Sequence, residues 1–121
     1  MSAFSKLSEL GPLPIWDGVL GRAVEGANTT LAVVELAPNS VVPEHQHHNE
    51  QLGLVLQGTL KVRIGGERCE VSPGDTYTIP ANVPHEFVTG PEGAVVVDIF
   101  SPVRADWSRF TPLAPQPPRW P

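Results

Sequence analysis

Two segments of the sequence decide the fold: PEHQHHNEQLGLVLQG at residues 43–58 and PGDTYTIPANVPHEF at residues 73–87. The first segment places His45 and His47 two positions apart and adds Gln51, and the second contributes His85. Both segments have the composition of β-strands or strand edges, and imidazole is the commonest side-chain ligand for Zn, Ni, Cu and Fe. The spacing therefore predicts one metal ion held between two distant stretches of a small β-barrel.

The composition predicts one domain that spans residues 1–121. The formal net charge of −5, without a block of basic residues, argues against a nucleic-acid partner. No apolar run approaches the ~20 residues of a membrane span, and the N-terminus lacks the pattern of a secretory signal. The single cysteine, Cys69, excludes an internal disulfide and suits a reducing compartment. We therefore expect a cytoplasmic protein. Cys69 itself is expected to be a small apolar residue of the core.

Short apolar runs separated by glycine and proline predict an all-β chain. Gly58 is expected to end one strand, and Gly90–Gly93 to form a turn between the last two. Antiparallel strands of this kind close as a jelly-roll barrel whose interior holds one small ligand. The expected strands are residues 19–25, 30–36, 41–47, 52–56, 60–64, 67–71, 76–79, 83–88 and 94–100.

The best-defined local prediction is a hairpin at Gly65-Gly66, because glycine at both turn positions permits the positive φ of a two-residue loop. That turn pairs Leu60 with Val71 on one face and sets Lys61 opposite Glu70 on the other.

We expect the barrel core to span about residues 16–104 and residues 105–121 to form a C-terminal extension. Residues 105–107 predict one helical turn, whereas the five prolines of residues 112–121 exclude a regular element. The tail is expected to lie over the surface in a polyproline-like conformation. A proline-rich motif for a partner protein is the alternative.

The histidines have two interpretations. A single buried histidine is more often a hydrogen-bonded core residue than a ligand, but two rings on one face of a strand and a third downstream predict a divalent metal ion. The ion is Ni, Zn, Fe or Mn. Either Gln51 or Glu50 faces it, because strand alternation puts the two on opposite faces. His48 is expected at the surface.

The two quoted segments resemble the two motifs of the cupin superfamily. In that family the first motif supplies two histidines and a carboxylate before a glycine-ended strand, and the second supplies one histidine after a proline-containing turn. Here Gly58 matches the glycine that closes the first motif. In the second motif, Gly74 and Pro80 match the framework positions, and His85 matches the metal ligand. The resemblance implies a single cupin barrel with one bound metal ion.

Counting back from Gly58, the position of the family's glutamate holds Gln51, which we favour over Glu50. A neutral amide beside three neutral imidazoles leaves a divalent ion its full charge. Such an ion attracts an anionic substrate more strongly and is a stronger Lewis acid.

A second group of candidates follows near the end of the barrel. Asp98 interrupts the apolar run AVVVDIF at residues 94–100, where alternation puts it on the same face as Phe100. Arg104 follows past Pro102 and can return toward Asp98. One interpretation is an ion pair that closes the barrel, and the other is an acid/base group beside an anion-binding guanidinium.

The order Asp-x-Phe-x3-Arg resembles the small single-domain cupins of pectin and alginate catabolism that linearise unsaturated uronates. This resemblance implies a small anionic sugar acid as substrate and conversion of a 4,5-unsaturated uronate to a linear keto acid. Asp98 would move the proton, Arg104 would bind the carboxylate and Phe100 would wall the pocket. The implied metal ligands are His45, His47, Gln51 and His85.

Gln51 and Tyr77 are further substrate-binding candidates, Gln51 as an alternative to its role on the metal and Tyr77 as an alternative to a core role. Two rival functions stay open: a metal-dependent dioxygenase, against which the missing carboxylate ligand argues, and a non-catalytic cupin that binds a small molecule. By resemblance alone we expect a homodimer.

Overall fold

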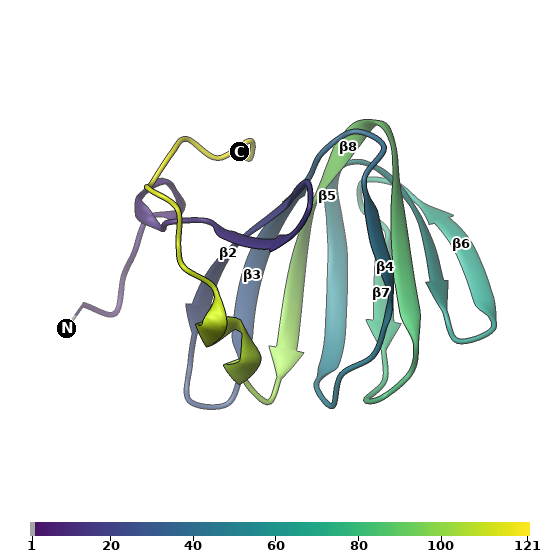
Figure 1. Cartoon of the computed structure of the whole chain (residues 1–121), viewed down its shortest axis with the longest axis horizontal. Coiled ribbons are helices and arrows are strands. Elements are labelled where there is room, and N and C mark those ends of the chain that lie inside the picture. The colour runs from purple at the N-terminus through teal and green to yellow at the C-terminus, as the bar shows by residue number, and fades with distance from the viewer. Residues whose placement is uncertain (1) are drawn as a thin grey trace.

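The computed structural model describes residues 2–121 and shows an antiparallel sheet of eight strands folded into a cup (Figure 1). The pairing order is β1-β2-β3-β8-β5-β6, with β4 added to β8 and β7 added to β5. The all-β prediction is confirmed. The elements are η1 (Leu7–Glu9), β1 (Leu13–Trp16), β2 (Val19–Glu25), β3 (Thr30–Leu36), β4 (Val41–His45), β5 (Glu50–Ile64), β6 (Glu67–Val71), β7 (Thr76–Ile79), β8 (His85–Ser101) and η2 (Ala105–Arg109).

Two long strands, β5 and β8, hold the cup together by pairing with each other along most of their lengths. The C-terminal part of β8 pairs with β3, while its N-terminal part pairs with β4. In the same way, the first part of β5 pairs with β7 and the last part with β6. Each long strand therefore belongs to both halves of the barrel.

The predicted strand ends at Gly58 and Gly90–Gly93 are wrong, because β5 and β8 continue through them. The β5–β8 ladder instead shifts register on both sides of Gly58, which has a φ of 75°. A Cβ at Gly58 would lie 2.0 Å from the carbonyl oxygen of Gly93. The glycines thus let two strands bend and approach each other, as a bulge does, without ending either strand.

The hairpin at Gly65-Gly66 has the predicted register, with Leu60 opposite Val71 and Lys61 opposite Glu70. The expected core position of Cys69 is wrong. Only the last residue of β6 is buried, so Cys69 is exposed on a hairpin that extends past the core.

The core lies between the two halves of the cup. Alternation along the last part of β8 holds as predicted, with Asp98 and Phe100 turned inward and Ile99 turned outward. The buried apolar side chains include Val34, Leu36, Val42, Val55, Leu60, Val62, Ile79, Phe87 and Val96.

After β8 the chain forms the expected helical turn, a 3-10 helix that begins at Ala105. The tail then lies against β2 and β3, where Arg22 and Glu35 form a buried ion pair at 2.7 Å. The backbone N–H of Arg119 donates to the Glu35 carboxylate at 2.7 Å, and Arg22 donates to the carbonyl of Gln116 at 3.2 Å. No helix within residues 2–121 is both long and apolar enough to cross a membrane.

Candidate metal centre

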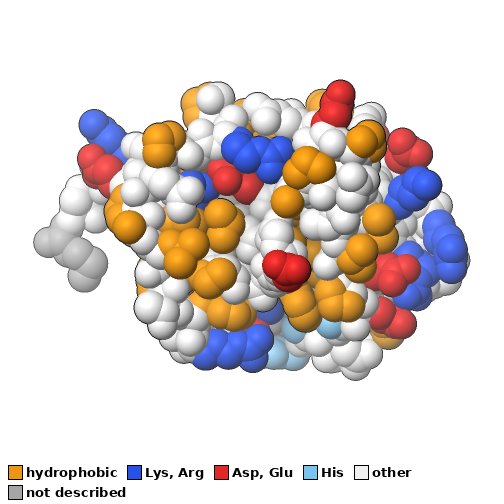
Figure 2. Space-filling model, turned by 45° about the horizontal axis from the view of Figure 1, so that its top comes forward, with side chains coloured by type: hydrophobic (Ala, Val, Ile, Leu, Met, Phe, Trp, Pro, Cys, Tyr) orange, Lys and Arg blue, Asp and Glu red, His pale blue; other side chains and the backbone are white. Residues whose placement is uncertain are grey.

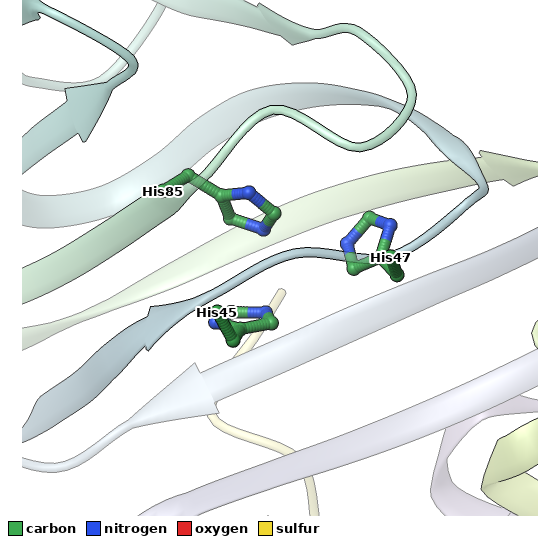
Figure 3. Close-up of side chains that lie close together, drawn as sticks. All are labelled: His45, His47 and His85. Atoms are coloured by element: carbon green, nitrogen blue, oxygen red, sulfur yellow. The ribbon is translucent and has the colours of Figure 1, made fainter.

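The three predicted histidines converge on one point. Ligand nitrogens of His45, His47 and His85 all lie within 4.8 Å of one another. Figure 3 shows the three rings turned toward a common space, two from the segment at the end of β4 and one from the start of β8. His85 is fully buried and the other two are half-buried. Three rings that converge in this way indicate a metal site rather than hydrogen-bonded core histidines.

Two strands and a short loop position these rings. His45 ends β4 and is the register partner of His85 at the start of β8, so the two ring centroids lie 4.3 Å apart. The predicted strand over residues 41–47 ends two residues early, and His47 belongs to the connection to β5. The His47 ring still lies 4.8 Å from the ring of His85.

Backbone carbonyls fix the same tautomer on all three rings. The Nδ1 atoms of His45, His47 and His85 lie 2.9, 2.9 and 2.8 Å from the carbonyl oxygens of Pro43, Asn49 and Val83. A carbonyl only accepts, so we assign the proton of each neutral ring to Nδ1, which leaves Nε2 as a lone-pair donor for a metal. The buried Nε2 of His85 has no hydrogen-bond partner within residues 2–121.

Gln51 lies beside this donor set. It is 3% exposed, whereas its neighbour Glu50 is exposed, as the alternation argument predicted. The Gln51 Oε1 atom lies 3.1 Å from His47 Nε2. With the His47 proton on Nδ1, two lone pairs face each other there, and a cation between them would relieve their repulsion. The residues present therefore fit a divalent metal ion.

Burial keeps these imidazoles neutral. It lowers the pKa of His45 and of His47 below 6.5, and the positive charge of Arg104 acts in the same direction. It lowers the pKa of His85 to about 4, against the opposing effect of the Val83 carbonyl. Neutral imidazoles near pH 7 are the form that binds a metal.

Asp98 lies inside the cup and is buried. Its Oδ1 atom accepts a hydrogen bond from the Tyr77 hydroxyl at 2.7 Å. Burial raises the pKa of Asp98 to about 6, opposed by hydrogen bonds from Tyr77 and Gln51 and by the charge of Arg104. A carboxyl with this pKa can gain and lose a proton near neutral pH.

Arg104 does not form an ion pair with Asp98, which was one of the two interpretations of the sequence. Its Nε and Nη2 atoms instead donate to the two carboxylate oxygens of Asp106, both at 3.0 Å. The guanidinium carbon lies 4.7 Å from the ring centroid of Phe100 and 4.6 Å from that of Trp107. Because Asp106 uses only two of the five guanidinium N–H groups, the others are left for an anion.

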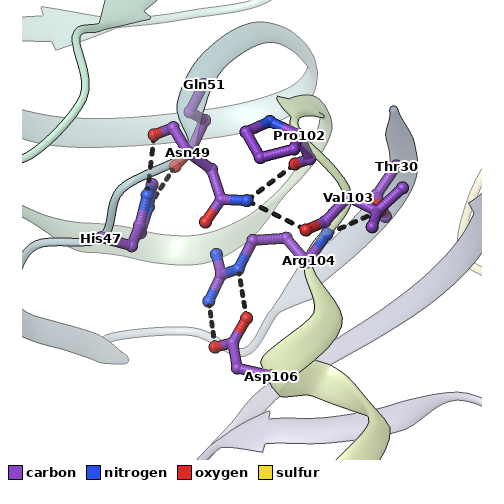
Figure 4. Close-up of polar contacts among 8 residues, drawn as sticks. All are labelled: Thr30, His47, Asn49, Gln51, Pro102, Val103, Arg104 and Asp106. Atoms are coloured by element: carbon purple, nitrogen blue, oxygen red, sulfur yellow. Dashed lines mark hydrogen bonds and ion pairs between the residues drawn. The ribbon is translucent and has the colours of Figure 1, made fainter. Parts of the chain in front are cut away.

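Asn49, which the sequence argument missed, connects the histidine cluster to the segment that carries Arg104. Asn49 is 1% exposed, and its Nδ2 donates to the carbonyls of Pro102 at 2.7 Å and Val103 at 3.1 Å (Figure 4). The backbone carbonyl of Asn49 accepts from His47, so Asn49 links one of the three converging histidines to the peptide that carries Arg104. Alternation back from Gln51 places residue 49 on the inner face, a signal that could have identified it.

A cavity of about 60 Å³ is lined by the predicted catalytic residues and by two of the predicted metal ligands, His45 and Gln51, but not by His47 or His85. In the space-filling view, histidine side chains form one group at the lower rim, flanked by Lys or Arg and by apolar side chains (Figure 2). Trp107 and Phe110, which the sequence argument did not single out, also line the cavity. The predicted site residues that line it are His45, Gln51, Tyr77, Asp98, Phe100 and Arg104.

Residues 32–100 match the family model of the cupin domain. The chain belongs to the cupin family. It is 32% identical over 93 residues, which cover 75% of this chain and 84% of the relative, to the pectin degradation protein KdgF of Dickeya dadantii (strain 3937).

Two solved structures of cupins are similar over nearly the whole fold. The structure of KdgF from Halomonas sp. superposes with a TM-score of 0.80 at 29% identity, covering 88% of this chain and 98% of that one. An RmlC-like cupin from Shewanella frigidimarina NCIMB 400 has a TM-score of 0.82 at 23% identity, covering 88% and 96%. The second likeness concerns the fold alone.

Proposed function

We propose that this protein is a metal-dependent cupin enzyme that converts a 4,5-unsaturated uronate to a linear keto acid. The observation that carries the proposal is the single cavity onto which His45, Gln51, Asp98, Phe100 and Arg104 open. The similarity to KdgF proteins, one of them named for pectin degradation, supports a sugar acid as substrate.

The residues of the site suit this substrate. A uronate carries a carboxylate, and Arg104 presents a guanidinium that contacts the rings of Phe100 and Trp107 and has N–H groups to spare. Phe100 offers the sugar ring an apolar wall.

The proposed reaction is an isomerisation that needs no water and no oxidant. The C1–O5 bond of the cyclic hemiacetal breaks, a proton leaves the C1 hydroxyl, and a proton reaches C4 as the enol becomes a ketone. Asp98, with its pKa raised by burial to about 6, is the group that takes up and returns this proton. A divalent ion bound by His45, His47 and His85, with Gln51 beside them, would act as a Lewis acid that stabilises negative charge on oxygen.

The test is incubation of protein of known metal content with unsaturated galacturonate. We expect the ultraviolet absorbance of the conjugated enoate to fall faster than in a protein-free control, with formation of the keto acid confirmed by mass and NMR. Binding without product would support a non-catalytic cupin, and oxygen uptake by the Fe-loaded protein would support a dioxygenase. Either of those outcomes would refute the proposal.

We also propose that the protein is a homodimer. Val24, Leu31, Ile99 and Leu52 are register neighbours across β2, β3, β8 and β5, and they are 38–45% exposed on the outer face. None of these side chains is charged, so two copies of a chain with net charge −5 can meet there without opposing like charges. Light scattering should give a dimer that Leu52→Asp converts to a monomer, while Val41→Asp on β4 leaves it intact.

The cytoplasm is the compartment that we propose for this activity. The single cysteine is exposed and free, as suits a protein of a reducing environment. Fractionation of the producing cell with an antibody to the protein tests this placement.

A further inference from the structure

Gly53 lies between Tyr77 and Asp98 on three neighbouring strands. In the sheet register, Gly53 of β5 is opposite Tyr77 of β7 on one side and opposite Asp98 of β8 on the other. Tyr77 donates its hydroxyl to Asp98 Oδ1 at 2.7 Å, so its side chain crosses the position of Gly53 to do so. Both partners of this bond are buried.

The tyrosine ring occupies the space that a side chain at position 53 would need. A Cβ placed on Gly53 would lie 2.0 Å from Tyr77 Cζ and 2.5 Å from its hydroxyl oxygen. Gly53 does not have a positive φ, so its backbone conformation is open to any residue. The close approach of the tyrosine ring is therefore the reason for glycine at this position.

We propose that Gly53 and Tyr77 form a positioning device for Asp98: the glycine leaves a groove, the tyrosine ring lies in it, and its hydroxyl fixes one carboxyl oxygen. Asp98 lines the cavity, where the substrate proton is to be exchanged. This inference rests on the proposed function for the role of Asp98. In this proposal Tyr77 acts by positioning the carboxyl of Asp98, and it does not contact the substrate.

A purely structural role does not account for the hydroxyl. The Tyr77 ring packs against Phe87 with centroids 5.5 Å apart, and a phenylalanine would make the same contact. A buried hydroxyl needs a partner, and within residues 2–121 the partner of Tyr77 is Asp98. Asp98 in turn interrupts an apolar strand, where an unpaired carboxyl is costly.

Tyr77 is the only tyrosine of the chain, so it gives a signal without overlap. Protein labelled with tyrosine carrying ¹³C at Cζ should show one resonance, whose shift reports the hydrogen bond of the phenol. We expect Asp98→Asn and Gly53→Ala to move this resonance, because each disturbs the Tyr77–Asp98 bond. The matched control is Gly66→Ala, since a Cβ at Gly66 meets nothing within 4 Å, and it should leave the resonance in place.

Kinetics of the metal-loaded enzyme on unsaturated galacturonate then separate positioning from substrate binding. A lost hydrogen bond to a charged group corresponds to a fall in kcat of roughly 10–100-fold for Tyr77→Phe. KM should stay within about twofold of the wild-type value, and the double variant Gly53→Ala with Tyr77→Phe should be no slower than the slower single variant.

Each result of these measurements is decisive. An unchanged kcat in Tyr77→Phe overturns the proposal, and a rise in KM with kcat kept assigns Tyr77 to the substrate instead. If Gly53→Ala does not fold, the isosteric Tyr77→Phe still decides. If the wild-type protein does not convert the sugar, the proposed function fails, while a resonance moved by Asp98→Asn but not by Gly66→Ala still supports the bond between Tyr77 and Asp98.

Discussion

The metal-free protein contains two buried groups whose titrations oppose each other, and this predicts a specific response to acid. Burial raises the pKa of Asp98 from 3.8 to about 6 and lowers that of His85 from 6.5 to about 4. The folded state therefore holds the Asp98 proton more tightly than the unfolded state does, so Asp98 adds stability below about pH 4 that is lost as the pH rises through 6. His85 adds stability above pH 6.5 that is lost as the pH falls toward 4.

Proton linkage converts these values into free energies of unfolding. Between pH 7 and pH 4.5, Asp98 contributes a gain of about 2 kcal/mol and His85 a loss of about 2 kcal/mol. The two nearly cancel in the wild-type protein, while His45 and His47, whose pKa values are also lowered, add to its loss of stability on acidification. Asp98→Asn removes the gain, so this variant should lose about 2 kcal/mol more than the wild type over the same interval.

Urea denaturation of metal-stripped protein at the two pH values measures this difference. His85→Asn should show the reverse behaviour, with a smaller loss on acidification than the wild type. Asp17→Asn, an exposed position, serves as the matched control and should follow the wild type. Equal losses in wild type and Asp98→Asn would show that the Asp98 carboxyl is not perturbed by burial, and the reasoning for its role as a proton carrier would be wrong.

Four further predictions concern the site and the tail. His85→Ala should lose most of the bound metal in elemental analysis, and unchanged metal content would contradict the ligand set. Asp98→Asn should keep its metal while turnover of the unsaturated uronate falls at least about 100-fold. Arg104→Lys should raise KM roughly 10–100-fold with a smaller change in kcat, because lysine lacks the planar fork that binds a carboxylate. Glu35→Gln should lower the free energy of unfolding by about 3 kcal/mol in urea, since it leaves a buried guanidinium without its counter-charge, whereas the exposed Glu25→Gln should change it by less than about 0.5 kcal/mol.

Local patterns predicted the parts of the fold that local forces determine. The register of the hairpin at Gly65-Gly66 was confirmed because the turn itself fixes the pairing. Strand alternation predicted the inward side of Asp98 and put Gln51 and Glu50 on opposite faces, whereas the choice of Gln51 as the inward residue came from the resemblance to cupins. The convergence of the three histidines was predicted from spacing together with the resemblance to cupins.

Features that depend on distant chain segments were not predicted. Gly58 looks like a strand end in sequence, but the opposing backbone of Gly93 makes it a bend in a continuous strand. The pairing of Arg104 with Asp106 depends on η2 turning back, and alternation along β8 carries no information about that turn. The buried pair of Arg22 and Glu35 likewise requires the tail to fold over β2 and β3.

The position of Cys69 on the exposed edge hairpin bears on how this protein is handled at the bench (Figure 1). As the chain's one thiol, it offers a single attachment point for a maleimide fluorophore or spin label. The same thiol can oxidise between two molecules and imitate a native assembly on a sizing column. Oligomer measurements therefore belong in a reducing buffer or on the Cys69→Ser variant.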